Sequence, residues 1–432
     1  MKSIIYQVLP RLWGKGKMSD WDEPAFNYLK SLGVDTVWYT GMPRHACGEE
    51  YVKGNPGSPY AIIDWFDVNP YLADNESERM VEFERLVSRT HHAGLKCLTD
   101  FIPNHVAKGY SGKIGTYDYC DGDWTDTRKV NYADPSTVPA MVDVLLFWAS
   151  KGVDGFRCDM VELVPPEAMA EIIRKVRDQY PSMLFVAEAY GRDNYRRYLD
   201  EVGFDLLYDK SGCYDILRGI LSGSRTCKEL TWNWQFLGDR QPRMLNFLEN
   251  HDEQRIASRW FASDVKRSWA ALAFAALFNT APFMLYAGQE LGETAEEGHE
   301  GRTSIFDWCK PESLSALYGY IYKGENPDPY GASILERYRK LLTTAASALF
   351  SEGGNWDLCY CNLDTPGFDA DRHFAFMRFN DNSAALVFCN FSDLKASLNL
   401  HIPIELKKYT SMDYIEVSAE SLDYKIITFC NI

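Results

Sequence analysis

Two charged residues, Arg157 and Asp159, stand at the end of a strand-like segment of the sequence that begins at Val153. Val153 and Phe156 suit a strand that packs on both faces, whereas Arg157 and Asp159, two positions apart, project from the same side of that strand. Buried charges are rare unless they are paired, so the two residues form either a structural ion pair or the catalytic end of a strand. The remainder of the chain favours the second interpretation.

More carboxylates follow other strand-like segments. Asp100 comes directly after the predicted strand 95–99, and Glu188 directly after 184–187. The predicted strand 244–248 leads into a run of four polar residues, Glu249, Asn250, His251 and Asp252. Because the C-terminal ends of parallel strands meet at one face of a sheet or barrel, we expect these groups to lie close together.

Apolar strands alternate with amphipathic helices over the first 345 residues or so, which is typical of a parallel sheet with crossover helices. Eight such units predict a TIM (β/α)8 barrel. Its strands are expected at 4–9, 36–39, 95–99, 153–158, 184–187, 206–208, 244–248 and 283–286. Helices are expected at 23–32, 77–92, 135–150, 166–180 and 333–345, and a long loop at 288–329.

Two parts of the chain depart from the barrel pattern. Residues 106–134 are rich in Gly, Asp, Tyr and Thr without a clear period, which predicts a short lid subdomain after the third strand. Residues 347–432 contain short alternating runs separated by turn residues, which predicts a C-terminal antiparallel β-sandwich domain. The predicted catalytic barrel therefore comprises 1–105 and 135–346.

The bulk composition restricts the kind of partner. Of the 432 residues, 46% are apolar, enough for a large core, and the formal net charge is −16. Such a charge argues against a nucleic acid or an anionic membrane as partner and favours a neutral ligand. No signal-peptide pattern is present at the start, and eleven cysteines without repeated spacing suit reduced thiols. We therefore expect a cytoplasmic protein, whereas its oligomeric state is not predicted.

Four motifs carry a resemblance to a known family, and they occur in order at four predicted strand ends: DFIPNH at 100–105, GFRCD at 155–159, FVAE at 185–188 and ENHD at 249–252. Each motif alone is weak. Together with Tyr6, Gln7 and Pro10 near the start, and GSPY at 57–60, they resemble the signature regions of the α-amylase family, glycoside hydrolase family 13. The resemblance covers almost the whole chain.

The resemblance implies roles for individual residues. Retaining glycosidases use two carboxyl groups about 5 to 5.5 Å apart. By resemblance, Asp159 is the nucleophile, Glu188 the general acid and base, and Asp252 the third catalytic carboxylate, which holds sugar hydroxyls. The implied substrate-binding residues are Tyr60, His105, Arg157 and His251. Asp100 is interpreted as a buried structural residue.

A metal site is implied less directly. Asn104 matches an asparagine that binds calcium in many α-amylases, where further ligands come from the lid and from a backbone carbonyl. The lid is short here, and its acidic residues at 118, 121, 123 and 126 also suit a solvated loop. We expect that no cofactor is required, with calcium at Asn104 as the alternative.

Three positions depart from patterns that are common in the family. Where many α-amylases carry a Lys-His pair after the nucleophile, this chain has Glu162 and Leu163, so the leaving-group side of the cleft must bind its sugar differently. Where enzymes that release single glucose units carry Asp after the stacking tyrosine, this chain has Ala61. That residue favours a cleft open to longer chains, or one releasing maltose-sized products, over an exo-acting glucosidase.

The sequence thus predicts a retaining hydrolase of α-1,4 bonds in maltooligosaccharides, starch or glycogen-type glucans. One alternative is a transglycosylase or isomerase with the same intermediate, acting for example on α-1,6 linkages, sucrose or trehalose. Another is a non-catalytic glucan-binding relative, which the presence of all three carboxylates disfavours. Trp356 and Tyr360 are either a starch-binding surface on the C-terminal domain or part of its packing against the barrel.

Overall fold

The computed structural model describes residues 2–295, 299–308 and 310–430. Eight parallel strands close into a barrel in chain order, and nearly all of their residues are buried. The strands are β1 (Ile4–Val8), β2 (Thr36–Tyr39), β5 (Lys96–Phe101), β8 (Gly155–Cys158), β9 (Leu184–Ala187), β10 (Leu206–Tyr208), β11 (Met244–Phe247) and β12 (Phe283–Tyr286). The predicted TIM barrel is confirmed, with strand ends that differ from prediction by two residues or fewer.

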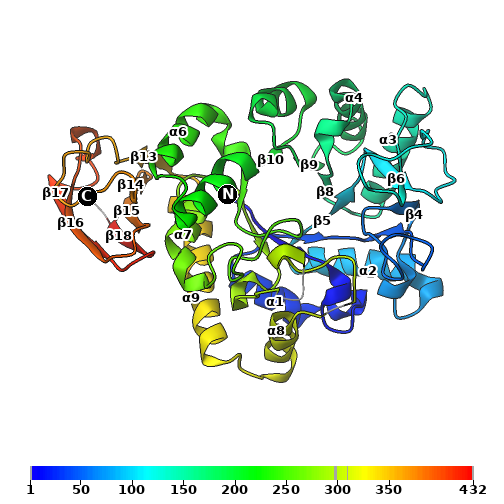
Figure 1. Cartoon of the computed structure of the whole chain (residues 1–432), viewed down its shortest axis with the longest axis horizontal. Coiled ribbons are helices and arrows are strands. Elements are labelled where there is room, and N and C mark those ends of the chain that lie inside the picture. The colour runs from blue at the N-terminus through cyan, green and yellow to red at the C-terminus, as the bar shows by residue number, and fades with distance from the viewer. Residues whose placement is uncertain (1, 296–298, 309, 431–432) are drawn as a thin grey trace.

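Helices surround this barrel (Figure 1). They are α1 (Glu23–Ser31), α2 (Arg79–His92), α3 (Thr137–Ser150), α4 (Pro166–Arg177), α5 (Asp215–Ser222), α6 (Lys228–Leu237), α7 (Trp269–Leu277), α8 (Glu312–Lys323), α9 (Pro329–Ala346) and the short α10 (Ala348–Ser351). Every residue of α7 is buried because this helix also packs against the C-terminal domain, where Phe274 lies 4.9 Å from Phe374 in an edge-on contact. No helix in the described ranges is both long and apolar enough to cross a membrane.

The prediction of one long loop over 288–329 is wrong where α8 forms. Leu314 and Leu317, three residues apart, are buried and give the helix an apolar face. Pro311 precedes the helix, and Gly324 ends it with a left-handed conformation, so these two residues delimit a helix that the sequence interpretation placed within a loop. Residues 296–298 and 309 of that predicted loop lie outside the described residues.

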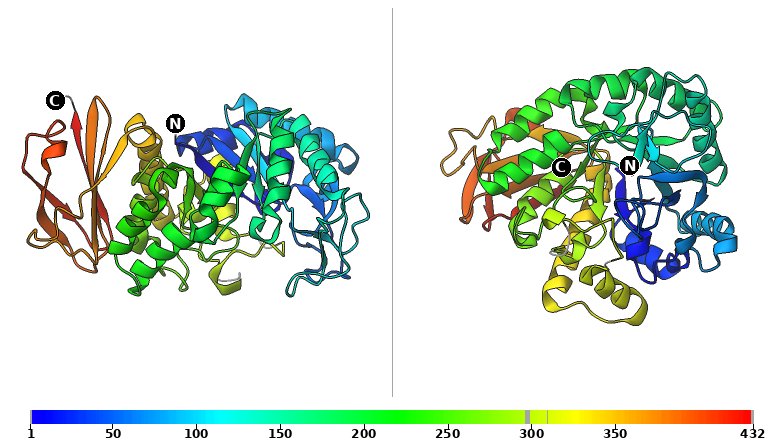
Figure 2. Two further views of the ribbon diagram at one scale, coloured as in Figure 1. Left: turned by 90° about the horizontal axis from the view of Figure 1, so that it is seen from above. Right: turned by 45° about the vertical axis from the view of Figure 1, so that its right-hand side comes forward.

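The excursion after the third barrel strand, residues 106–134, contains little regular structure. The short strands β6 (His105–Ala107) and β7 (Thr127–Lys129) pair in antiparallel fashion at its base. Beside it lies a second hairpin, β3 (Pro43–His45) with β4 (Ile62–Val68). This excursion and the C-terminal domain lie at opposite ends of the long axis of the molecule (Figure 2).

The C-terminal domain is antiparallel, as predicted. A four-stranded sheet contains β13 (Gly354–Asp357), β14 (His373–Phe379), β15 (Ser383–Asn390) and β18 (Tyr424–Cys430), and a second sheet pairs β16 (Ala396–His401) with β17 (Tyr414–Ala419). In β17 the buried residues alternate with exposed ones, because one face of the sheet contacts a separate apolar core. Trp356 is half-buried, and its Nε1 donates to the exposed Tyr360 hydroxyl at 3.3 Å.

Candidate active site

The three predicted catalytic carboxylates follow strands of the barrel at its C-terminal face. Asp159 comes directly after β8 and Glu188 directly after β9, and these strands are neighbours with Cys158 opposite Ala187. Their order is fixed by backbone hydrogen bonds, since the Glu188 amide donates to the Cys158 carbonyl at 3.0 Å. Asp252 lies in the loop after β11. The two carboxylates that follow β8 and β9 are therefore held by sheet geometry, and the third is brought in by a loop.

Arg157 joins the three carboxylates. It is 1% exposed. Its Nη1 donates to Asp159 Oδ1 at 2.5 Å, and its Nη2 lies 2.8 Å from Glu188 Oε2 and 3.8 Å from Asp252 Oδ2. The guanidinium also lies 5.4 to 5.6 Å from the ring centres of Trp38, Tyr60 and Tyr208. The structure thus places one buried cation, enclosed by aromatic rings, among three acids.

Glu188 is 4% exposed and receives hydrogen bonds on both carboxyl oxygens. The Tyr190 hydroxyl donates to Oε1 at 2.6 Å, and the Met160 amide donates to Oε2 at 2.9 Å. Burial raises the pKa of Glu188 to about 7, although Arg157 opposes that shift. A carboxyl group with this pKa is partly protonated near neutrality, as a general acid requires.

Met160 has an unusual backbone conformation directly after Asp159. Its φ of 44° and ψ of 43° are left-handed, a region that residues other than glycine rarely adopt. This turn directs the Met160 amide to Glu188, and so ties the loop after β8 to the carboxylate after β9. The local strain thus accompanies a contact between two groups of the candidate site.

Burial and neighbouring charges also shift the pKa values of the other two carboxylates, in opposite directions. Burial raises the pKa of Asp159 above its usual value, while Arg157 opposes the shift through its charge and its hydrogen bond. Burial acts on Asp252 as well, but the neighbouring His251, through its charge and its hydrogen bond, together with Arg157, lowers the pKa of Asp252 to about 2. Asp252 is therefore ionised over the whole neutral range, when Glu188 is not.

The predicted sugar-binding side chains adjoin these acids. The ring of Tyr60 stacks on that of His251 at 5.2 Å, and the His251 Nε2 lies 3.0 Å from Asp252 Oδ2. Gln7 Nε2 contacts His251 Nδ1 at 2.6 Å. His105 lies at the start of β6, where burial lowers its pKa to about 4, so its imidazole is neutral near pH 7. The structure thus brings Arg157 and His251 into direct contact with the acids and places Tyr60 against both of these residues.

Asp100 has a structural environment, as interpreted from the sequence. It is 1% exposed and accepts hydrogen bonds from Trp38 Nε1 at 3.1 Å and from the Gly41 amide at 2.9 Å. These contacts join the second and third barrel strands. Asp100 also accepts a long hydrogen bond of 3.5 Å from the Tyr60 hydroxyl, so it supports the wall of the site from behind Tyr60.

Several residues of the site were not identified in the sequence. Glu162 accepts hydrogen bonds from the Tyr190 amide at 2.8 Å and from Asn194 Nδ2 at 2.8 Å, and so fixes the loop that carries Tyr190. The sequence marked position 162 as unusual because it lacks the family's Lys-His pair. The hydrogen-bond partners of Glu162 lie some 30 residues further along the chain, so its role could not be predicted. A cavity of about 270 Å³ beside Asp252 is lined by Lys53, Arg302 and Phe306. No sequence motif distinguished those three.

The residues expected at a calcium site do not fit one. Asn104 Nδ2 donates to Asp121 Oδ2 at 2.9 Å, and Lys129 Nζ donates to the two oxygens of Asp121 at 3.0 and 2.8 Å. An ammonium group therefore already neutralises the acid nearest to Asn104, whereas calcium requires six to eight oxygen ligands. Within the described part of the chain, no cluster of three or more His, Cys, Asp or Glu is arranged to bind a metal.

Comparisons with known proteins agree with this geometry. A family model described as the catalytic domain of α-amylase matches residues 24–126. The chain is 26% identical over 430 residues to an α-amylase of Haloarcula japonica, an alignment covering 92% of this chain and 56% of that protein. It is 31% identical over 211 residues to an α-1,4-glucan:maltose-1-phosphate maltosyltransferase of Cereibacter sphaeroides, covering 42% of this chain and 34% of that protein.

Among solved structures, an α-amylase of Lactobacillus plantarum superposes with a TM-score of 0.74 at 21% identity, covering 99% of this chain and 98% of the other. The chain spans a little over half the length of the Haloarcula protein and about a third of the Cereibacter protein. The ordered motifs, the barrel and these similarities lead to one assignment. The chain carries an α-amylase-type catalytic domain, and the proteins that it resembles are α-amylases and related enzymes.

Proposed function

We propose that this chain is a retaining hydrolase of α-1,4-glucosidic bonds in maltooligosaccharides and in starch or glycogen-type glucans. The observation that carries the proposal is the set of three carboxylates around Arg157, whose pKa values are driven apart to about 7 for Glu188 and about 2 for Asp252. Groups with such different proton affinities can act as acid and as permanent anion at the same pH. The similarity to α-amylases supplies the substrate class.

The proposed first step forms a covalent glycosyl-enzyme. Asp159 Oδ attacks the anomeric carbon while Glu188 transfers its proton to the glycosidic oxygen, and the bond between that carbon and that oxygen breaks. Arg157 favours the ionised form of Asp159, which is the form that attacks. Asp252 stays ionised, so its charge stabilises the positive charge that develops on the sugar ring in the transition state.

The second step releases the sugar. Glu188, now ionised, removes a proton from a water molecule, and the resulting nucleophile displaces Asp159 from the anomeric carbon with net retention of configuration. Tyr190 donates to Glu188 Oε1, a hydrogen bond that stabilises this ionised form. The same carboxyl group therefore serves as acid in one step and as base in the next.

We propose further that the reaction needs no metal ion, since Lys129 supplies the positive charge beside Asp121 and Asn104. Endo-type cleavage of longer chains, or release of maltose-sized products, is supported by Ala61, which is buried and presents no charge to a terminal sugar. The C-terminal sheet domain plays no part in the chemical steps.

A second candidate is transglycosylation from the same intermediate. It is favoured by the 31% identity of part of the chain to a maltosyltransferase, and by the aromatic rings that enclose Arg157 and limit access of water. In that reaction a sugar hydroxyl, in place of water, loses its proton to Glu188 and attacks the same carbon.

A time course with maltoheptaose separates the two candidates. The protein is incubated with and without chelator, and products are followed by chromatography and by proton NMR of the newly formed anomeric centre. The proposal predicts α-configured products shorter than the substrate at the earliest times, at a rate that chelator does not change. Early products longer than maltoheptaose would show that the enzyme transfers sugars instead of hydrolysing the substrate. Products of β configuration would contradict the retaining mechanism.

A further inference from the structure

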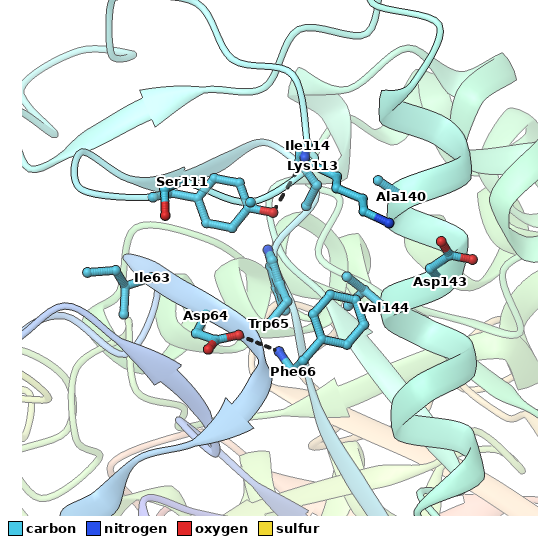
Figure 3. A pocket seen from close by; sticks show the side chains of 12 residues that line it. Ile63, Asp64, Trp65, Phe66, Ser111, Lys113, Ile114, Ala140, Asp143 and Val144 are labelled. Carbon is cyan, nitrogen blue, oxygen red and sulfur yellow. Dashed lines mark hydrogen bonds between the residues drawn. The ribbon is translucent and has the colours of Figure 1, made fainter.

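A second pocket lies on the flank of the barrel, away from the Arg157 cluster. Its volume is about 250 Å³, and it is enclosed by β4, by residues 110–114 of the excursion and by α3. Figure 3 shows these three segments converging on it. None of its lining residues belongs to the candidate active site or to the cavity beside Asp252. We call it the flank pocket.

Aromatic side chains form one wall of the flank pocket. Phe66 is 46% exposed, an unusual exposure for a large apolar ring. Its position is fixed from behind by Phe147 of α3, whose ring lies 5.2 Å away in an edge-on contact. Tyr110 lines the opposite side and is half-buried, with its hydroxyl accepting from the Ile114 amide at 3.4 Å. The pocket therefore presents ring surfaces that are held in place before any ligand arrives.

Polar groups surround these rings. Asp64, Ser111, Lys113 and Asp143 line the pocket, so its rim holds two carboxylates and one ammonium group. Trp65 lies beneath these groups and is 1% exposed, so its ring closes the floor of the pocket while its buried indole nitrogen is not accessible to a ligand.

We propose that the flank pocket is a second glucan-binding site, which holds one pyranose ring of an α-glucan outside the catalytic cleft. A pyranose offers an apolar C–H face to the Phe66 ring and hydroxyl donors to Asp64 and Asp143. The pocket is slightly smaller than the range of about 300 to 1,000 Å³ usual for small-molecule sites, which suits a single ring. The two carboxylates and the net charge of −16 disfavour an anionic ligand.

The choice of a glucan, among neutral ligands, depends on the proposed function. The pocket is built partly by the excursion and partly by β4, and β4 begins two residues after Tyr60 of the cleft. A polymer held in the flank pocket would remain attached to the enzyme between cleavage events, whereas a short substrate is released after each cleavage and gains nothing from that attachment. We therefore expect this site to affect binding of polymers and to leave hydrolysis of short substrates unchanged.

The test is affinity electrophoresis of the full chain in native gels that contain glycogen. Variants are made in a Glu188→Gln background, so that the polymer is not cut during the run. Removal of the ring by Phe66→Ala is expected to raise the apparent Kd for glycogen about tenfold. Asp143→Asn, at an exposed position of α3, is expected to raise it about threefold, as the loss of one hydrogen bond to a charged group would. Tyr414→Ala removes an exposed ring of β17 and serves as the matched control, with no change.

Parent-like retardation of both the Phe66→Ala and the Asp143→Asn proteins would overturn the proposal, as would an absence of retardation in the background protein itself. Maltotriose hydrolysis is measured separately, on the same substitutions in the active enzyme, and is expected to stay within twofold of the parent. If the proposed catalytic function is wrong, the parent enzyme will not hydrolyse maltotriose, and the glycogen gels will not be affected. Weaker glycogen retardation of the Phe66→Ala and Asp143→Asn proteins would then still support a binding site in the flank pocket. The two proposals can therefore fail independently.

Discussion

Glu188 and Glu249 share several properties, although only one of them belongs to the candidate catalytic set. Both follow barrel strands, both are almost fully buried, both lie beside a buried arginine, and burial raises the pKa of each to about 7. The pKa value alone therefore does not identify the catalytic acid. The difference between the two glutamates lies in the arginine that each one contacts and in the other partners of that arginine.

Glu249 is fully committed to structural contacts. Its Oε2 accepts from Arg255 Nη1 at 2.7 Å and its Oε1 accepts from the Ile256 amide at 2.7 Å. Arg255 in turn donates to Thr303 Oγ1 and to the Ala287 carbonyl. Every part of this pair has a partner, which is the condition under which a buried ion pair stabilises a loop. Here the loop is the one that carries Asp252.

Arg157 is shared among three acids, and among the described residues its Nη2 has no aligned hydrogen-bond acceptor, although Glu188 Oε2 is 2.8 Å away. Asp252, the third acid, retains a side-chain exposure of 36%. The cluster is thus incomplete within the protein, and a substrate can complete it. The comparison teaches that Glu188 differs from Glu249 in the arginine beside it, which is shared with a partly exposed acid, and that the shifted pKa alone does not distinguish them.

The largest effect is expected from Glu188→Gln. Without the acid, kcat for glucans should fall about 10³-fold. The fold should survive, since the Gln oxygen can accept from Met160 while its amide donates to the Tyr190 hydroxyl. Kinetics with maltoheptaose and with α-glucosyl fluoride, whose leaving group needs no proton, check this. An equal loss on both substrates would show that Glu188 is not the acid.

Glu249→Gln should produce the opposite pattern. A glutamine has only one oxygen for two donors, so either Arg255 or the Ile256 amide loses its acceptor, and the free energy of unfolding should fall by about 3 kcal/mol. The kcat of the folded fraction should change less than tenfold. Urea denaturation measures the free energy of unfolding, and an assay at low temperature measures kcat. A Glu249→Gln protein that is stable but inactive would show that Glu249, like Glu188, is needed for catalysis.

Tyr190→Phe tests how the pKa of Glu188 is tuned. The phenol donates to the carboxylate and lowers its pKa, so its removal should raise that pKa and move the alkaline limb of the kcat/KM profile to higher pH by up to about one unit. The rate at the optimum should change less than tenfold. A pH profile that falls at all pH values without a shift would assign Tyr190 a purely structural role.

The smallest effects concern the calcium question. Chelator should leave Tm and activity of the parent unchanged, because Lys129 already neutralises Asp121. Lys129→Met should lower the free energy of unfolding by about 1 kcal/mol, since this ion pair is partly exposed. Thermal melts with and without calcium measure both. A parent Tm that rises with calcium would contradict the assignment of Lys129 as the local cation.

Most of the barrel could be predicted because its strands are short, apolar and bounded by glycine or proline. Strands β2, β9, β10 and β12 occur at the predicted residues. The helix α8 was missed because a half-polar, tyrosine-rich segment between Pro311 and Gly324 has a weak apolar period. The helices α5 and α6 likewise lacked a specific prediction.

Some residues of the candidate site could likewise be predicted from the sequence, and others could not. Asp159, Glu188 and Asp252 follow strands or lie within motifs, so their positions were accessible from the sequence. Glu162 and Tyr190 were not, because their roles depend on hydrogen bonds between separate loops. The flank pocket was equally inaccessible, since its walls come from three distant segments and no motif marks Phe66 or Asp143.

The most direct test of the central claim is the capture of the covalent intermediate. The protein is treated with a 5-fluoro-α-glucosyl fluoride, which forms the glycosyl-enzyme and slows its hydrolysis, and the intact mass and peptide masses are then measured. The account predicts one added sugar per chain, located on the peptide that contains Asp159 and absent from an Asp159→Asn variant. Turnover without a trapped sugar, or a sugar on another residue, would contradict it.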